Sequence, residues 1–151
     1  MEILEETDQK VIIWANYVHN IHEIIGALND KYGSKSVVSI YGEVSQQQRM
    51  TAVERFQNDP ECRFFVGNPT TGGYGLTLTA AKYVIYYSNN YNLEVRLQSE
   101  DRAHRIGQTK NVVYIDIIAK DTIDERIVQA LKRKIQLSAK TLGDKAKDWL
   151  L

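Results

Sequence analysis

Five short apolar runs divide this chain, and they constrain its fold more than any other feature. They are rich in β-branched and aromatic residues and span residues 10–15, 36–41, 62–67, 83–88 and 112–119. Most are continuously apolar, as expected of strands that are covered on both faces. Segments with helical periodicity separate them, and the first of these has an apolar stripe made of Val18, Ile21, Ile24, Ile25 and Leu28. This alternation predicts an α/β fold with a mostly parallel sheet of about five or more strands and helices on both faces.

Two of the predicted helices begin with recognisable capping residues. Ser45 is followed three residues later by Gln48, which is a capping-box pattern, and the apolar face of this helix would come from Met50, Val53 and Phe56. The preceding loop, residues 42–44, could instead present backbone amides to a phosphate, although the cap is the favoured interpretation. Near the end of the sequence, Thr122 and the acids that follow it predict a C-terminal helical extension from about residue 122. Its apolar face would come from Ile123, Ile127, Ala130, Leu131 and Ile135.

Composition indicates a folded globular protein rather than a disordered one. The chain has 151 residues, of which 43% are hydrophobic and 25% charged, and its net charge is zero. Neutrality argues against strong nonspecific nucleic-acid binding by the whole surface. A single cysteine excludes an internal disulfide and suits a reducing compartment. With no signal-peptide pattern and no membrane-spanning run, we expect one intracellular domain, monomeric when isolated and without a membrane partner.

The segment 64–78 follows a predicted strand and is rich in glycine. Gly67 and Gly72 have the spacing of a P-loop, but Gly73 and Tyr74 stand where lysine and serine or threonine are required. A dinucleotide-binding fingerprint also fails, because no glycine stands three residues after Gly75. The glycines alone therefore predict only a tight strand-to-helix turn.

The segment 98–108 carries the strongest functional signal. It places Arg102 and Arg105 at a spacing that puts both side chains on one face of a helix. Two neighbouring guanidinium groups suit a phosphate, because each donates paired hydrogen bonds to its oxygens. This segment resembles motif VI of the Swi/Snf-type helicase-like ATPases, whose pattern Q-x-x-D-R-x-H-R-I-G-Q is matched at every fixed position.

Further blocks support the same resemblance. The segment 64–78 resembles motif V of that family, with matches at Gly72, Gly73, Gly75 and Leu78. Asn68, Pro69, Thr71 and Thr77 depart from its usual residues. Residues 10–16 resemble motif IV. The segment 86–93 matches the family's D-x-D-W-N-P block only at Asn92 and at the aromatic Tyr91. From residue 10 to about 134, the order of the blocks is that of the family's C-terminal RecA-like lobe.

The resemblance implies a three-layer RecA-like sandwich and a single helicase C-terminal domain over residues 1–151. It also implies a function as the second lobe of a DNA-dependent, ATP-hydrolysing helicase or translocase. Arg102 and Arg105 would be the catalytic arginine fingers. Nucleotide contacts would come from Gln98, Asp101, Gly73 and Gly75. Contacts to the nucleic-acid backbone would come from Asn16, Gly42, Ser45, Thr70, Thr71 and Gly72.

The implied partners are an N-terminal RecA-like lobe and the backbone of double-stranded DNA. ATP with Mg²⁺ would be held mainly by that lobe, because this sequence contains no G-x-x-x-x-G-K-[S/T] segment and no Asp-Glu-x-His segment. The isolated chain should therefore be inactive as an ATPase. The resemblance leaves the compartment open between the cytoplasm of a bacterium or virus-infected cell and the nucleus of a eukaryote.

The sequence is also compatible with two other interpretations. A non-catalytic DNA- or protein-binding module could share the fold, but the presence of both arginines favours the ATPase. A strand-separating helicase of the wider superfamily is disfavoured by Asp101 and by the run 104–108. His19 and His22 lie at helical spacing but without a neighbouring carboxylate or cysteine pair, so we expect no metal site.

Overall fold

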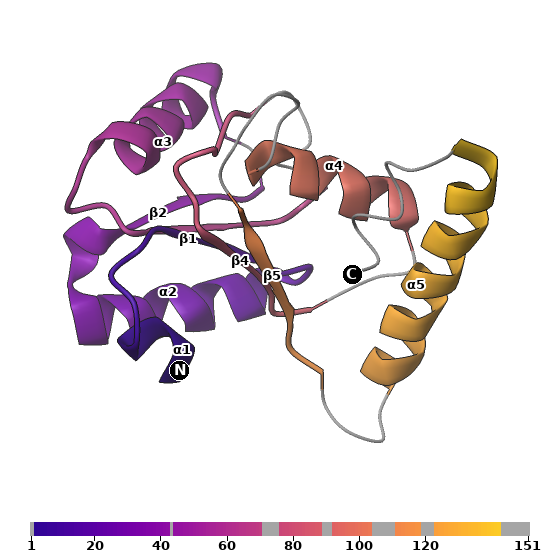
Figure 1. Ribbon diagram of the computed structural model, residues 1–151. Coiled ribbons are helices and arrows are strands. Elements are labelled where there is room, and N and C mark those ends of the chain that lie inside the picture. The colour runs from indigo at the N-terminus through magenta and orange to yellow at the C-terminus, as the bar shows by residue number, and fades with distance from the viewer. Residues whose placement is uncertain are drawn as a thin grey trace.

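The computed structural model of the chain describes residues 2–42, 44–70, 76–88, 92–103, 111–118 and 123–142. Strands and helices alternate along most of this length, as Figure 1 shows. The strands are β1 (Val11–Trp14), β2 (Val37–Ile40), β3 (Phe64–Gly67), β4 (Tyr83–Tyr86) and β5 (Val113–Asp116). The helices are α1 (Glu2–Glu5), α2 (Val18–Tyr32), the 3-10 turn η1 (Ser34–Ser36), α3 (Gln46–Asn58), α4 (Leu93–Ala103) and α5 (Ile123–Leu142).

The five strands of the described residues form one parallel sheet in the order β2-β3-β1-β4-β5. Each predicted apolar run contains one strand, and each strand is four residues long, shorter than the run that predicted it. In Figure 1, α1 and α2 lie on one side of the sheet, and α3 and α4 lie on the other. The predicted α/β sandwich, with a parallel sheet between two layers of helices, is confirmed.

Two hydrophobic cores, one on each face of the sheet, hold the layers together. Alternate residues of a strand point to opposite faces, so Ile12 and Trp14 enter the first core while Val11 and Ile13 enter the second. In the first core, Phe56 of α3 packs with its ring edge-on to Phe65. The second core is closed by the apolar stripe of α2, in which Ile21, Ile24 and Leu28 are buried.

The sequence predicted several apolar side chains on buried faces that are in fact exposed. Met50 of α3 is 62% exposed, because the buried face of that helix is centred on Ala52 and Phe56. Val18 of α2 is half exposed at the first turn of the helix. Ile123, at the start of α5, is also exposed. Each error falls at or near the first turn of a helix, where a side chain can extend past the edge of the sheet.

The amino-terminal edge of the sheet is tied to the start of the chain by Arg63. Its guanidinium donates to the carbonyl oxygens of Leu4, Thr7 and Gln9 and lies over the rings of Tyr32 and Phe64. This arginine therefore has a structural role at the end of the sheet opposite to the predicted functional residues.

The helix predicted from about residue 122 is α5, and its described part begins at Ile123. It contacts α4, and Ile127, Val128 and Leu131 are buried on its inner face. Among the described residues, no helix combines the length and apolar character needed to cross a membrane.

Candidate functional site

The carboxyl ends of the parallel strands meet in one row at one edge of the sheet. Trp14 is in register with Gly67 and Tyr86, and Tyr86 is in register with Asp116. The loops that follow these strands must all leave from this edge, which is where ligands bind in open parallel sheets. Several residues predicted to contact nucleic acid, among them Asn16, Gly42 and Thr70, lie in these loops.

Side-chain hydrogen bonds join the ends of three strands at this edge. The backbone N–H of Asn16 donates to Ser88 Oγ at 2.8 Å, and Asn68 Nδ2 donates to the carbonyl oxygen of Asn16 at 3.1 Å. The backbone N–H of Thr70 donates to Asn68 Oδ1 at 2.8 Å, which closes a local turn. The structure thus brings Asn16 and Thr70 together through Asn68. Asn68 departs from the family pattern at its position and was not predicted as a site residue.

A small cavity lies beneath this edge, between the strand ends and α4. Its volume is about 10 Å³, and Asn16, Tyr86, Ser88, Arg96 and Ser99 are among its lining residues. A space of this size suits about one water molecule. This cavity is therefore too small to hold a nucleotide.

The amino end of α3 has the capping box that the sequence predicted. The backbone N–H of Gln48 donates to Ser45 Oγ at 3.1 Å, and that of Ser45 donates to Gln48 Oε1 at 3.0 Å. Gly42, with φ of +64°, turns the chain in the left-handed region before this helix. The structural interpretation of Ser45 is therefore confirmed, while its contact with nucleic acid stays a prediction.

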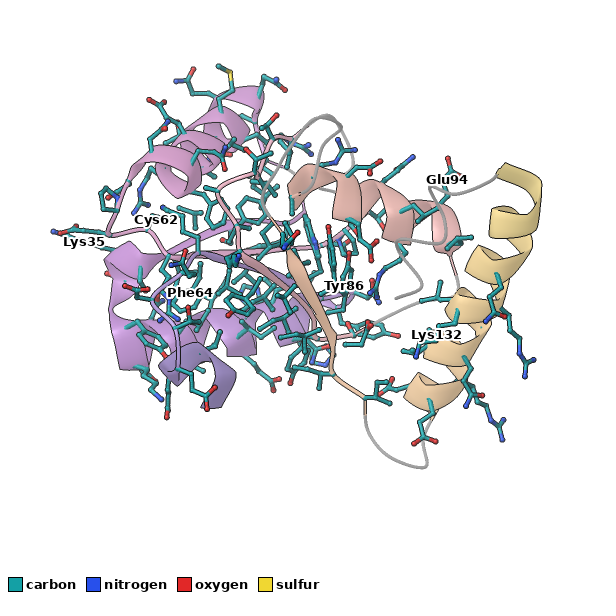
Figure 2. The ribbon with its side chains drawn as sticks, viewed as in Figure 1. Lys35, Cys62, Phe64, Tyr86, Glu94 and Lys132 are labelled. Carbon is teal, nitrogen blue, oxygen red and sulfur yellow. The ribbon has the colours of Figure 1, made fainter. Side chains whose placement is uncertain are left out.

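Helix α4 carries three of the residues predicted to act on ATP. Gln98 and Asp101 are exposed and Arg102 is half-buried. Gln98 Nε2 lies 3.4 Å from Oε1 of Glu94, which projects from the outer side of α4 in Figure 2. The carbonyl oxygen of Arg102 accepts a 2.8 Å hydrogen bond from the backbone N–H of Leu78. This bond joins the arginine helix to the segment that follows the glycine-rich loop, so the two motifs are neighbours in the fold.

Five predicted site residues lie outside the described part of the chain: Arg105, Thr71, Gly72, Gly73 and Gly75. Helix α4 is described as far as Ala103, so the helical pairing of Arg102 with Arg105 stays a prediction. The predicted sites at Asn16, Gly42, Ser45, Thr70, Gln98, Asp101 and Arg102 are placed on described loops and helices.

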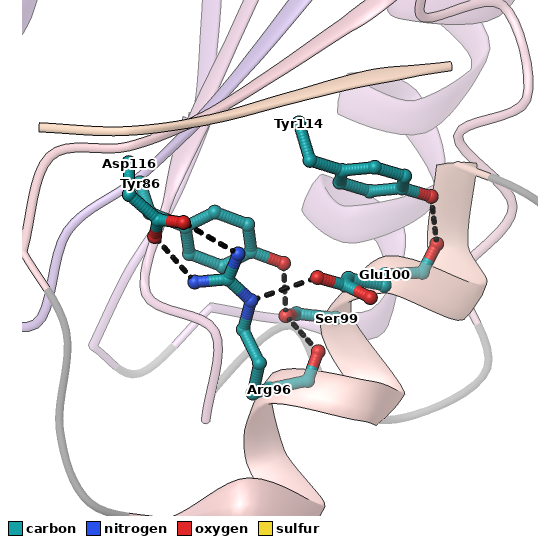
Figure 3. A network of polar contacts seen from close by, with 6 residues as sticks. All are labelled: Tyr86, Arg96, Ser99, Glu100, Tyr114 and Asp116. Atoms are coloured by element: carbon teal, nitrogen blue, oxygen red, sulfur yellow. Dashed lines mark hydrogen bonds and ion pairs between the residues drawn. The ribbon is translucent and has the colours of Figure 1, made fainter. Parts of the chain in front are cut away.

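The inner face of α4 carries a polar network that sequence reasoning missed (Figure 3). Arg96 Nε donates to Glu100 Oε1 at 2.8 Å, and its two terminal nitrogens donate to the Asp116 carboxylate at 2.6 and 3.1 Å. The guanidinium carbon lies 3.4 Å from the centre of the Tyr86 ring. The Tyr86 hydroxyl and Ser99 Oγ are 2.7 Å apart. Four polar side chains from α4 and two strands are therefore fixed around one arginine.

Burial and charge in this network shift the protonation of its members. Burial raises the pKa of Glu100 to about 8, because the contacts with Arg96 only partly offset the loss of solvent. Burial opposes the charge on Arg96, but Asp116, Tyr86 and Glu100 outweigh it and raise the pKa of the guanidinium. Burial and the neighbouring Glu100 also raise the pKa of Tyr86 and of Tyr114. Arg96 therefore stays charged at neutral pH.

The sequence gives only an ambiguous signal for this network. The buried positions of α4 are Arg96, Ser99, Glu100 and Ala103, which recur at helical spacing, whereas Leu97 on the other side is 38% exposed. A helix whose periodic face is polar normally turns that face to solvent, so sequence reasoning assigned it no contact. The inward orientation depends on partners far away in the sequence.

The two histidines of α2 face aromatic rings instead of each other. His19 stacks on Tyr17, with ring centres 5.8 Å apart, and His22 meets Tyr41 edge-on at 5.1 Å. Across the residues that the structure covers, no group of three or more histidine, cysteine, aspartate or glutamate side chains could hold a metal ion.

The Helicase conserved C-terminal domain family matches residues 1–107 of the chain. Lymphoid-specific helicase of Homo sapiens is 42% identical over 97 residues, which are 63% of this chain and 12% of that protein. Chromatin-remodeling ATPase INO80 of Candida albicans is 34% identical over 113 residues, 75% of this chain and 8% of that protein. The chain thus spans only about a tenth of the length of these relatives.

Solved structures show the same likeness. The Sulfolobus solfataricus SWI2/SNF2 ATPase core in complex with double-stranded DNA superposes with a TM-score of 0.70 at 31% identity. The match covers 90% of this chain and 28% of that one. The shared architecture therefore includes the parallel sheet and its two helical layers.

Proposed function

Because this chain belongs to the Helicase conserved C-terminal domain family, among the Swi/Snf-type ATPases, we propose that it is the second lobe of a DNA-dependent ATP hydrolase and translocase. The observation that carries the proposal is the hydrogen bond from Leu78 to the carbonyl oxygen of Arg102. It joins the segment after the glycine-rich loop, which would contact DNA, to the helix that would act on ATP. A movement at one of these sites would therefore be transmitted to the other.

In this mechanism Arg102 and Arg105 donate hydrogen bonds to the γ-phosphate and stabilise the negative charge that develops during its transfer. Gln98 helps to position the same phosphate, Asp101 orients the guanidinium groups, and Gly73 and Gly75 allow a close approach of the nucleotide. The donors on α4 are N–H groups that suit phosphate oxygens rather than a metal ion. We therefore assign Mg²⁺, which neutralises phosphate charge when bound, and most ATP contacts to a first RecA-like lobe.

Double-stranded DNA would lie along the carboxyl edge of the sheet. Asn16 and Thr70, held together by Asn68, would contact its backbone, with further contacts from Gly42, Ser45, Thr71 and Gly72. Phosphate contacts position a duplex without reading its sequence, so the binding should be sequence-independent. Closure of the two lobes on ATP and their opening after hydrolysis would move the protein along the duplex.

We further propose that residues 1–151 act as one domain that is monomeric when isolated. Its compartment would be the nucleus in a eukaryote and the cytoplasm in a bacterium or virus-infected cell. The relatives named as chromatin remodellers support a DNA substrate packaged with protein.

The proposal can be tested with the chain supplied with a first lobe that contains a P-loop. DNA-stimulated ATP hydrolysis is measured for the wild type and for Arg102→Ala and Arg105→Ala. Loss of an arginine finger should lower the rate on the order of a thousandfold or more. The isolated chain should hydrolyse ATP no faster than buffer, because one lobe cannot clamp the nucleotide.

Arg55→Ala is the matched control. This arginine lies on α3 and donates to the carbonyl oxygen of Lys35, which precedes β2 at the opposite end of the sheet. Its loss should leave the rate of hydrolysis unchanged. If the folded Arg102→Ala and Arg105→Ala proteins both hydrolyse ATP at the wild-type rate, the arginine-finger assignment is wrong. If the two-lobe wild type binds DNA but does not hydrolyse ATP, the chain is a non-catalytic binding module.

A further inference from the structure

Helix α4 is held on the sheet by polar contacts, and Arg96 is at their centre. Its side chain is only 7% exposed, and it bonds to Asp116 at the end of β5 and to Glu100 one turn further along α4. We propose that Arg96 is a positioning residue for ATP hydrolysis, which sets the orientation of α4 and hence the direction of Arg102. This inference rests on the proposed function.

The contacts of Arg96 fix the helix in several directions at once. The paired hydrogen bonds to Asp116 define the plane of the guanidinium and connect it to β5. The Tyr86 ring, whose centre is 3.4 Å from the guanidinium carbon, connects the guanidinium to β4. Glu100 Oε1 accepts a hydrogen bond from Nε, the third donor nitrogen of Arg96. A lysine at this position would keep the charge but could reproduce neither the paired bonds nor the flat stacking.

The next turns of α4 are held in the same manner. Ser99 Oγ bonds to the Tyr86 hydroxyl and donates to the carbonyl oxygen of Arg96, and the Tyr114 hydroxyl donates to the carbonyl oxygen of Glu100 at 3.3 Å. The last turn is held by the bond between Leu78 and Arg102. Because α4 is a rigid helix, a shift at Arg96 is carried to Arg102, six residues or about 9 Å along the axis.

A purely stabilising role accounts poorly for this arrangement. Buried ion pairs often contribute little to stability, because the cost of removing charges from water can exceed their attraction. An apolar stripe would attach α4 to the sheet equally well, as Ile21, Ile24 and Leu28 do for α2. Directional bonds give the helix one orientation, which is what a catalytic arginine at its end requires, since a misplacement of about 1 Å can lower a rate about a hundredfold.

The test is Arg96→Lys in the two-lobe ATPase, with kcat and KM for ATP measured at saturating DNA. We expect kcat to fall about tenfold to a hundredfold while KM changes by less than about twofold, because an arginine finger acts mainly in the transition state. Asp116→Asn weakens the paired hydrogen bonds between Arg96 and the carboxylate, and should also lower kcat. The side chain of Asp116 is 23% exposed, so this change is less buried than Arg96→Lys. It serves as the second variant if Arg96→Lys does not fold.

Arg63→Lys is the matched control, because Arg63 also stacks on aromatic rings and donates to several partners, but at the opposite edge of the sheet. It should lower stability and leave kcat within about twofold of the wild type. The inference is overturned if Arg102→Ala is impaired while Arg96→Lys and Asp116→Asn keep the wild-type kcat. It is also overturned if Arg63→Lys lowers kcat as much as Arg96→Lys does. If the wild type is inactive or Arg102→Ala unimpaired, the proposed function fails, and this inference fails with it.

Discussion

Gly67 occupies the last position of β3, where three neighbours leave no room for a side chain. A Cβ atom there would lie 2.9 Å from the carbonyl oxygen of Ile40, 3.2 Å from Trp14 and 3.3 Å from Phe65. The first of these is a backbone atom of the adjacent strand, so relief would require the strands to separate. The glycine that resembles the start of a P-loop in the sequence is therefore needed for packing.

We expect Gly67→Ala to lower the free energy of unfolding by about 1–3 kcal/mol, measured by urea denaturation of the chain. Gly26→Ala is the matched control, because a Cβ atom at this position in the middle of α2 would meet nothing within 4 Å. That substitution should raise the free energy of unfolding by about 0.5–1 kcal/mol. An unchanged stability of Gly67→Ala would show that the strand ends can move apart at little cost.

Glu100 makes stability depend on pH. Burial raises its pKa to about 8, whereas in the unfolded chain the pKa of a glutamate is about 4.3. Between these values the folded protein holds a proton that the unfolded chain releases, so the free energy of unfolding falls as pH rises through this window. The groups that act on this carboxyl are Arg96, Asp116, Asp101, Tyr86 and Tyr114.

Glu100→Gln keeps the shape of the side chain and cannot titrate. The free energy of unfolding of this variant, minus that of the wild type, should increase from pH 5 to pH 8 by up to about 1.4 kcal/mol for each pH unit. Urea denaturation at three pH values measures the difference. Glu54→Gln, at an exposed position of α3, is the matched control for the loss of one carboxylate and is measured at the same pH values. A constant difference between Glu100→Gln and the wild type would contradict the expectation.

At the scale of a single element, one residue at the start of α3 has two assigned roles. Ser45 caps the amino end of the helix and is also predicted to contact DNA. Ser45 satisfies the N–H of Gln48 through its hydroxyl, and the predicted DNA contact would use the same side chain. Ser45→Ala should therefore lower the stability of the chain by about 1 kcal/mol. Ser45→Asp should keep the cap, because aspartate caps as well as serine, yet weaken DNA binding severalfold by repelling phosphate. Thermal unfolding and DNA titration separate the two roles, and unchanged DNA affinity of Ser45→Asp would leave Ser45 only its structural role.

The helices also show how far periodicity can be used for prediction. In α2 the stripe Ile21, Ile24 and Leu28 was predicted correctly, because apolar residues at helical spacing have one favourable environment. In α4 the same spacing is occupied by Arg96, Ser99 and Glu100, and a polar stripe is compatible with solvent as well as with a buried network. The pairing of Arg96 with Asp116, 20 residues further along the chain, is what places this stripe in a buried network instead of in solvent. That contact is a property of the tertiary structure, and no local pattern contains it.

At the scale of the whole molecule, the alternation of strands and helices predicted the parallel sheet, and the resemblance predicted its sandwich architecture. The strand order β2-β3-β1-β4-β5 does not follow from the apolar runs, because it depends on which strands pair over long distances. Of the candidate site, the structure describes where several predicted residues lie, and their roles stay predictions. Asn16 and Thr70 are both at the carboxyl edge, as strand-end residues of a parallel sheet must be, and Arg102 is on the adjacent helix. Asn68 and Arg96 were missed because their roles lie in contacts with distant backbone and side-chain groups.

The central place of β1 has a consequence for how this domain is made. Val11 pairs with Phe64 on one side and with Tyr83 on the other, so both neighbours of the first strand are synthesised long after it. At roughly 5–20 residues per second, the apolar segment 11–15 leaves the ribosome about 4–14 s before its second partner strand exists. During that time the edge of β1 that later pairs with β4 is open to other chains and to chaperones. The strand that is made first is the one that depends most on strands made later.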